Sequence, residues 1–143
     1  MRHETNPVRV YADGSCLNNG TKWARAGSGA YAGPSSSLNF ALRVPDAQTN
    51  NRGEVYAILQ TISRAPPHKT LHIFSDSEYA MDTLVQRGPD NDARGWDITN
   101  GDLFRDIVKL IQRRPAPLKL IQVKGHSGLA MHDNADALAK EGA

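Results

Sequence analysis

The strand-forming segments of this chain lie in its first third, and the helix-forming segments come after them. Residues 8–12 alternate between apolar and polar side chains, which is typical of a half-buried strand. Residues 27–31 and 38–44 are two further strand candidates, and each follows a turn-rich stretch, Asn18-Asn19-Gly20 or Gly33-Pro34-Ser35. Three short antiparallel strands therefore open the predicted fold.

Helical and strand patterns then alternate along the rest of the chain. One predicted helix ends at Pro66-Pro67, residues 71–75 form a strand, a second helix follows, and a loop rich in Gly, Pro and Asp occupies residues 88–95. A third helix, a strand over residues 118–123 and a short helix near residues 133–141 close the chain. The apolar residues that mark the three longer helices are Val55, Ile58, Leu59 and Ile62, then Met81, Leu84 and Val85, then Leu103, Ile107, Leu110 and Ile111.

This order of elements predicts an α/β fold built on one five-stranded mixed sheet, with three antiparallel strands and two parallel ones, flanked by helices. The 143 residues, 39% of them apolar, suffice for a single domain with its own core. We expect residues 8–143 to form that domain and residues 1–7 to be a polar lead-in. In such a sheet a ligand collects beyond the carboxyl ends of the parallel strands.

Composition narrows the class of protein further. The single cysteine, Cys16, excludes an internal disulfide and fits a reducing compartment, and the polar N-terminus lacks the apolar segment of a signal peptide. No run of about 18 apolar residues could span a bilayer. The sequence therefore predicts an intracellular protein without a membrane partner, and we expect a monomer. Lys and Arg exceed Asp and Glu by only 17 to 15, so bulk charge does not by itself indicate a nucleic-acid partner.

Four acidic residues sit where these elements would direct their carboxylates toward one point. Asp13 closes the first predicted strand and Asp76 follows the fourth, while Glu54 and Asp136 lie near the starts of two helices. Carboxylates that converge in a small space repel one another, and hard divalent cations make such a cluster tolerable. The arrangement indicates a metal site for phosphodiester cleavage.

Each acid taken alone also has a simpler interpretation. Asp13 could form a turn with the glycine after it, and Glu54 could pair with Asn51 at the start of a helix. Asp76 could cap the next helix, and Asp136 could complement a helix dipole. Only their joint placement at one edge of the sheet favours a shared site.

Four motifs surround these acids in order along the chain: Tyr11-Ala12-Asp13-Gly14-Ser15 with Asn19-Gly20, Gln48-Thr49-Asn50-Asn51-Arg52-Gly53-Glu54, Phe74-Ser75-Asp76-Ser77, and Gly125-His126-Ser127-Gly128 with Ala135-Asp136-Ala137-Leu138-Ala139. Their order and spacing resemble type 1 ribonuclease H, most closely the catalytic domain of the cellular, eukaryotic-type enzymes. The resemblance covers nearly the whole chain. It implies the ribonuclease H-like fold and metal-dependent hydrolysis of the RNA strand of RNA/DNA hybrids, leaving 5′-phosphate and 3′-hydroxyl ends.

The resemblance also implies roles for single residues. Asp13, Glu54, Asp76 and Asp136 would be metal ligands, and His126 would shuttle protons or help release product. Two Mg²⁺ ions held by such carboxylates can activate a water and stabilise the leaving 3′ oxygen, and Mn²⁺ could substitute. Outside this resemblance, a single loop histidine is more often an ordinary surface residue.

Further residues would read the substrate. Only RNA carries the 2′-hydroxyl, which small amides and backbone groups can test along a shallow minor groove. The residues that the resemblance implies for substrate binding are Cys16, Asn18, Asn19, Asn50 and Asn51 on the RNA strand, and Thr49, Tyr79 and Arg94 on the DNA strand. The alternatives are that the asparagines form turns and caps and that Tyr79 belongs to the core.

The chain departs from the family pattern at three places. Ala47 stands where relatives often have an arginine of the phosphate pocket, His132 replaces a usual asparagine, and residues 87–101 are shorter and more acidic than the family's basic protrusion. These changes imply a weaker grip on phosphate. Two rival functions remain. One is a hybrid-binding module without catalysis, which the intact set of acids disfavours. The other is a DNA-acting nuclease or strand-transfer domain, which the asparagines and the Gly125-His126-Ser127-Gly128 loop disfavour.

Overall fold

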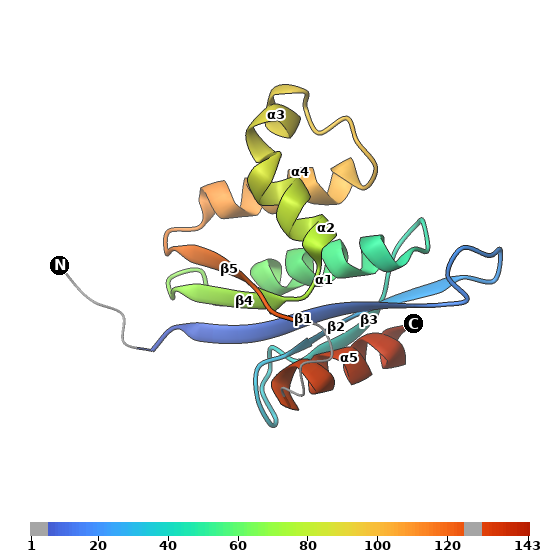
Figure 1. Ribbon diagram of the computed structural model, residues 1–143. Coiled ribbons are helices and arrows are strands. Elements are labelled where there is room, and N and C mark those ends of the chain that lie inside the picture. Colours follow the sequence, from blue (N-terminus) through green and yellow to red (C-terminus); the bar gives the residue numbers. More distant parts are fainter. Residues whose placement is uncertain (1–5, 125–129) are drawn as a thin grey trace.

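A five-stranded sheet forms the centre of the computed structural model, which describes residues 6–124 and 130–143 (Figure 1). The strands are β1 (Val8–Leu17), β2 (Arg25–Tyr31), β3 (Phe40–Arg43), β4 (Leu71–Ser75) and β5 (Leu118–Gln122), in the spatial order β3-β2-β1-β4-β5. The β1–β2 and β2–β3 pairs are antiparallel, whereas the β1–β4 and β4–β5 pairs are parallel. The predicted mixed sheet is confirmed.

Helices cover both faces of this sheet. Helices α1 (Asn50–Arg64) and α4 (Gly101–Arg113) lie on one side, and α5 (Ala130–Gly142) lies on the other (Figure 1). Between β4 and α4 the chain forms α2 (Glu78–Met81), a π-helical turn η1 (Asp82–Gln86) and α3 (Gly88–Ala93), which extend away from the sheet as an arm. No helix in the described part of the chain is long and apolar enough to cross a membrane.

The main core lies between the sheet and the pair α1 and α4. Its largest fully buried side chains come from β1, β4, α1 and α4, and include Val10, Leu71, Ile73, Val55, Ile58, Phe104 and Ile107. Burying a side chain of this size stabilises the folded state by about 1.5–3 kcal/mol. The ring of Phe104 also stacks on Trp96, with ring centroids 5.7 Å apart, which attaches the end of the arm to the core.

Two predicted strand and loop boundaries were wrong. The first strand does not end at residue 12, because its antiparallel pairing with β2 continues from Tyr11 opposite Tyr31 to Leu17 opposite Arg25. Residues 88–95 are not a loop throughout, since α3 occupies Gly88–Ala93. The proline in the first turn of α3 starts this helix rather than breaking it.

Two predictions about helices were also wrong. The second helix is not one regular α-helix, because a π-helical turn follows α2 at Asp82–Gln86, and Val85 within that turn is 55% exposed. The last helix is longer than predicted and begins at Ala130. Asp136 therefore lies in its second turn, where it no longer complements the positive end of the helix dipole.

Glycines let α1 and α5 approach the sheet backbone to backbone. A Cβ atom at Gly14 of β1 would overlap the backbone nitrogen of Glu54, and a Cβ atom at Gly29 of β2 would overlap the backbone of α5 at Ala135. The Ser28 hydroxyl of β2 donates a hydrogen bond of 2.6 Å to the backbone of α1. These contacts fix the positions of both helices, and therefore of the acids that they carry.

Candidate active site

Asp13 and Asp76 lie beyond the carboxyl end of the parallel β1–β4 pair. That pairing ends at Tyr11 opposite Phe74, whose rings stack with centroids 4.6 Å apart. β1 is also the strand at which the sheet changes from antiparallel to parallel pairing. The edge where the sequence predicted a ligand therefore carries both acids.

The simpler interpretations of three acids do not hold. Asp13 lies inside β1, opposite Gly29, and not in a turn. The N-cap of α1 is Thr49, whose hydroxyl accepts a hydrogen bond from the Arg52 backbone nitrogen at 3.1 Å, so Glu54 is not part of the cap. The cap of α2 is Ser77, not Asp76.

Glu54 is buried and points at the same place. Its carboxyl group contacts Asp13 and the backbone N–H of Gly14. Its Oε2 atom is buried and has no hydrogen-bond partner among the described residues. An orphaned carboxylate oxygen in the interior is costly, and a cation would satisfy it.

Asp136 lies at the outer side of this group. It is partly exposed, and its Oδ2 atom is 3.0 Å from the Lys140 ammonium one helical turn later. All four acids that the sequence singled out nevertheless line one cavity of about 270 Å³, together with Gly14, Ser15, Cys16, Asn50, His132 and Asp133.

Burial and mutual repulsion perturb the acids at the centre. Burial first, and the charge of Asp76 second, raise the pKa of Asp13 to about 7, although His132 and the Gly14 N–H partly offset the rise. Burial, followed by the charges of Asp13 and Asp76, raises the pKa of Glu54 well above its ordinary value. Without a cation, the cluster therefore holds protons at neutral pH.

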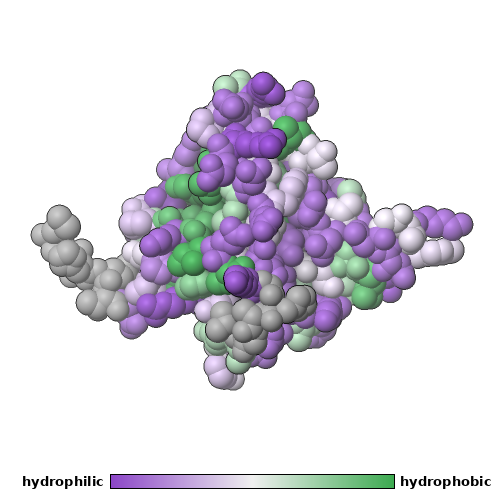
Figure 2. Space-filling view, viewed as in Figure 1, coloured by the Kyte–Doolittle hydropathy of each residue, from purple (hydrophilic) through white to green (hydrophobic). Residues whose placement is uncertain are grey.

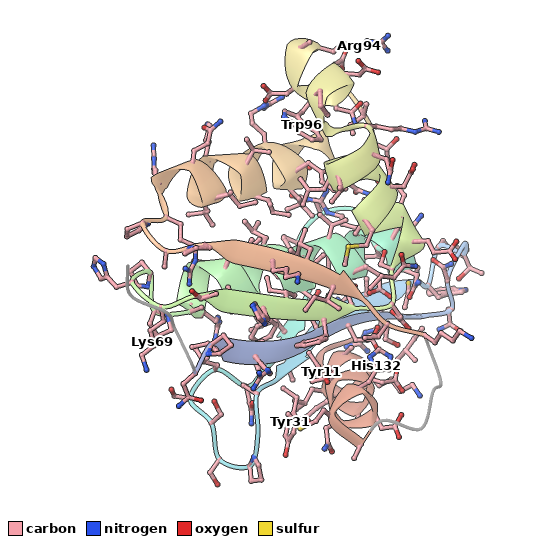
Figure 3. The ribbon with its side chains drawn as sticks, turned by 60° about the vertical axis from the view of Figure 1, so that its left-hand side comes forward. Tyr11, Tyr31, Lys69, Arg94, Trp96 and His132 are labelled. Atoms are coloured by element: carbon pink, nitrogen blue, oxygen red, sulfur yellow. The ribbon has the colours of Figure 1, made fainter. Side chains whose placement is uncertain are left out.

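The site also contains a buried histidine that the sequence prediction did not place there. His132 was noted only as a departure from the family pattern, yet it is 3% exposed and lies on the side of α5 that faces the sheet (Figure 3). Its Nε2 atom is 3.2 Å from Asp76 Oδ2 and 3.8 Å from Asp13 Oδ2. The four-residue spacing between His132 and Asp136 could have indicated that both lie on one face of a helix.

Several residues predicted to contact RNA gather beside the cavity. Cys16 and Asn50 line it, and the Cys16 thiol lies 3.6 Å from the backbone oxygen of Gln48. The Asn19 side chain accepts a hydrogen bond from the Asn50 backbone nitrogen at 3.3 Å, which links the β1–β2 hairpin to α1. Asn51 is exposed on α1.

Asn18 has a structural role in the same hairpin. It adopts φ 54°, and its carbonyl oxygen accepts hydrogen bonds from both the backbone nitrogen and the hydroxyl of Thr21. The turn interpretation of this asparagine is thus confirmed.

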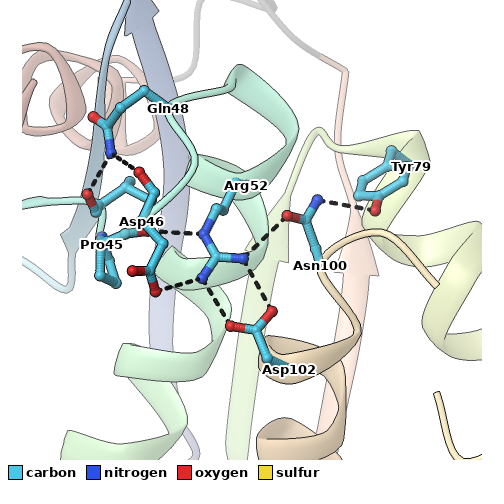
Figure 4. A network of polar contacts seen from close by, with 8 residues as sticks. Pro45, Asp46, Gln48, Arg52, Tyr79, Asn100 and Asp102 are labelled. Atoms are coloured by element: carbon cyan, nitrogen blue, oxygen red, sulfur yellow. Dashed lines mark hydrogen bonds and ion pairs between the residues drawn. The ribbon is translucent and has the colours of Figure 1, made fainter. Parts of the chain in front are cut away.

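The start of α1 is held by a buried guanidinium (Figure 4). Arg52 makes two hydrogen bonds to Asp102 of α4, at 3.0 and 2.8 Å, and this pairing lowers the pKa of Asp102. Arg52 also donates to Asn100, whose amide in turn donates to the Tyr79 hydroxyl at 3.1 Å. The network connects Glu54's helix to the arm.

The residues predicted to contact DNA are distributed around this network. Tyr79 is partly buried and its ring packs against Phe104 at the edge of the core, while its hydroxyl accepts a hydrogen bond from Asn100. Thr49 already uses its hydroxyl as the α1 cap. Arg94 is exposed at the outer end of α3 (Figure 3). His126, which was predicted to shuttle protons or help release product, lies outside the described residues.

A larger and more open groove lies between the arm and β5. It has a volume of about 660 Å³ and includes Tyr79, Met81, Val85 and Leu120 in its lining. Figure 2 shows an apolar patch over this part of the surface. The groove offers packing area, whereas the smaller cavity offers converging carboxylates, so we place the chemistry in the smaller cavity.

Similarity to solved structures agrees with this geometry. "Crystal structure of LC9-RNase H1, a type 1 RNase H with the type 2 active-site motif" superimposes with a TM-score of 0.77 and 26% identity, covering 98% of this chain and 74% of that one. "Structure of the foamy viral protease-reverse transcriptase in complex with dsDNA" gives a TM-score of 0.78 at 16% identity, covering 99% and 97%, which supports the fold alone. The fold and the acids at its sheet edge define a protein of the ribonuclease H-like class.

Sequence comparison makes the assignment more specific. The sequence pattern of the RNase H family matches residues 5–143, and the chain belongs to the ribonuclease H family. Ribonuclease H1 of Rattus norvegicus is 35% identical over 144 residues, which cover 95% of this chain and 50% of that protein. The chain thus spans about half the length of this curated relative.

Proposed function

We propose that this chain is a metal-dependent endoribonuclease that hydrolyses the RNA strand of RNA/DNA hybrids, leaving 5′-phosphate and 3′-hydroxyl ends. One observation carries the proposal: carboxylates from β1, from α1, from the residue after β4 and from α5 line a single cavity. In that cavity Glu54 Oε2 is buried without a partner among the described residues. Membership of the ribonuclease H family supports the same activity.

The donor set suits hard divalent cations. Asp13, Glu54, Asp76 and Asp136 supply carboxylate oxygens, the ligands that Mg²⁺ prefers, with Mn²⁺ as a substitute. Two bound ions would activate the attacking water and stabilise the leaving 3′ oxygen. Because the pKa of Asp13 is raised to about 7, cation binding near neutral pH should displace protons from the cluster. His126 is proposed to carry protons at the leaving group or to help release product.

Substrate selection is proposed for the surface that borders the cavity. Three small polar residues lie close together at this border, namely Cys16, Asn19 and Asn50. They could contact successive nucleotides of the RNA strand and test for its 2′-hydroxyl groups. On the same hairpin Trp23 is 68% exposed, with the Lys22 ammonium 4.9 Å from its ring centre. An exposed aromatic ring beside a cation offers stacking and charge to a nucleic acid.

We propose that the DNA strand of the hybrid binds on the other side of α1. Thr49 at the helix start and Tyr79 on the arm are joined to the Arg52 network, which would hold them in place during binding. Arg94 at the end of α3 would add a phosphate contact further out. We also propose that residues 8–143 act as one catalytic domain and as a monomer, which light scattering of the free protein tests.

A cleavage assay tests the function directly. Labelled RNA/DNA hybrid, duplex RNA and duplex DNA would be incubated with the protein, with and without Mg²⁺, beside the Asp76→Asn variant. Cleavage of only the hybrid's RNA strand, dependent on metal and on Asp76, is the expected result. Hybrid binding without cleavage would favour the inactive module, and cleavage of duplex DNA would favour the DNA-acting alternative.

A further inference from the structure

We propose that His132 supplies its Nε2 atom as a third protein ligand to the cation held by Asp13 and Asp76, and that this nitrogen shifts the site's preference from Mg²⁺ toward Mn²⁺. The inference deepens the proposed function, on which it rests only for the presence of a divalent cation at these two acids. It concerns a residue that the family pattern does not place among the metal ligands.

The first argument is the geometry of the three side chains. One ligand atom from each of Asp13, Asp76 and His132 lies within 4.8 Å of the others, a spacing at which a single ion can contact all three. Nε2 is the ring atom that faces the acids, at 3.2 Å from Asp76 and 3.8 Å from Asp13. Glu54 Oε2, buried and unpartnered among the described residues, provides an independent sign that this cavity is built around a ligand.

The second argument is that the imidazole cannot easily leave. His132 is 3% exposed, and α5 is held against β2 by backbone contacts at Gly27 and Gly29. A side chain that is packed in this way keeps its position when an ion binds. Nε2 therefore stays within reach of an ion bound at Asp13 and Asp76.

The third argument concerns the proton of the ring. Nδ1 is buried and has no hydrogen-bond partner within residues 6–124 and 130–143. In the metal-free protein, the contacts of Nε2 with Asp76 and Asp13 are therefore the described contacts that would hold the ring proton on Nε2. Nε2 can then offer its lone pair once a cation replaces its contact with Asp76.

The chemistry of the donor set gives the direction of the preference. Mg²⁺ prefers oxygen ligands in a nearly ideal octahedron and keeps several waters, whereas imidazole nitrogen suits first-row transition ions. An asparagine, the residue that the family pattern has at this position, would offer an amide oxygen instead. Exchanging that oxygen for a nitrogen should strengthen Mn²⁺ binding relative to Mg²⁺.

The test measures metal binding without substrate. Calorimetric titration would give the Mn²⁺ and Mg²⁺ affinities of the wild-type protein, of His132→Asn, and of His68→Asn as a control in which an exposed histidine is replaced. We expect His132→Asn to lower the ratio of Mn²⁺ to Mg²⁺ affinity by about tenfold, which is the lower end of the loss in metal affinity caused by mutating an outer-shell partner of a metal site. His68→Asn should leave the ratio unchanged.

A spectroscopic measurement on the wild-type protein provides a readout that does not depend on any variant folding. Electron spin-echo spectroscopy of bound Mn²⁺, with histidine labelled by ¹⁵N, should show the coupling of a directly coordinated imidazole nitrogen. Absence of that coupling, an unchanged affinity ratio, or equal tightening of both metals in His132→Asn would overturn the proposal. The last outcome would mean that His132 competes with the metal. Since no nucleic acid is present, a failure of the proposed hydrolase activity would appear only in the cleavage assay.

Discussion

Replacing Asp13 by asparagine should stabilise the metal-free protein at pH 8 even though it removes a residue of the proposed active site. The amide oxygen of the new side chain can still accept the hydrogen bond that the Gly14 backbone N–H donates to Oδ1 of Asp13 at 2.9 Å. What the substitution removes is a charge that is buried beside Glu54 and Asp76. The sign of the effect therefore follows from electrostatics and not from packing.

The magnitude follows from the difference between the folded and unfolded pKa values of Asp13. Burial and the charge of Asp76 raise the folded value to about 7, against an ordinary value of 3.8. The folded protein thus binds the proton more tightly, so the free energy of unfolding falls as the pH rises from about 4 to 7 and the full penalty is present above 7. At 1.36 kcal/mol per pH unit the penalty is on the order of 4 kcal/mol. This penalty already includes the attraction between Asp13 and His132. Because burying the new amide has its own desolvation cost, we expect a net gain of about 2–3 kcal/mol at pH 8.

Denaturant unfolding in EDTA at pH 4, 6 and 8 measures this gain. The stabilisation by Asp13→Asn should be largest at pH 8 and nearly absent at pH 4, whereas Asp106→Asn, at an exposed position of α4, should change stability by less than about 0.5 kcal/mol. Millimolar Mg²⁺ or Mn²⁺ should raise the melting temperature of the wild type and reduce the advantage of the variant. A variant less stable than wild type in EDTA at pH 8, or a gain independent of pH, would refute the reasoning.

Three further predictions concern turnover and packing. Asp76→Asn should keep the fold and abolish hybrid cleavage with little loss of hybrid binding, as single-turnover and binding assays would show; near-normal cleavage in Mg²⁺ contradicts the proposed site. Gly29→Ala should destabilise the protein by at least about 2 kcal/mol in denaturant unfolding, because its Cβ meets the α5 backbone, while Gly88→Ala, with open space around it, should be nearly neutral. His126→Ala should lower turnover less than Asp76→Asn does and flatten its dependence on pH between about 6 and 9, with metal affinity retained; wild-type rates would mean that the histidine is only a surface residue.

The sequence was sufficient for features that depend on neighbouring residues and on strand order. Three strands before the first helix require antiparallel pairing, and the later strands arrive through helices, which makes them parallel. Once β1 and β4 are neighbours, acids placed after equivalent positions of the two strands meet at one edge, as Asp13 and Asp76 do. No long-range information beyond this pairing was needed.

Features that depend on how distant elements pair or pack against each other could not be predicted in this way. The length of β1 is set by β2, which pairs as far as Leu17, and so the position of Asp13 inside a strand depends on a partner strand. The cap of α1 is a similar case, because Thr49, Asn50 and Asn51 are all acceptable caps by composition. Arg52 selects among them by anchoring the helix to Asp102, fifty residues later in the chain.

His132 shows most directly that the sequence gives the type of a residue but not the direction in which its side chain points. In the sequence it is only an exchange for a usual asparagine, and the effect expected of the departures was a weaker grip on phosphate. In the folded chain α5 begins at Ala130 and its backbone meets β2 at two glycines, and these contacts turn the imidazole toward Asp13 and Asp76. Its consequence should therefore appear in metal binding and not in phosphate affinity. Measuring the salt dependence of hybrid binding for His132→Asn separates the two, because a lost phosphate contact changes the slope by about one unit and a changed metal ligand leaves it unaltered.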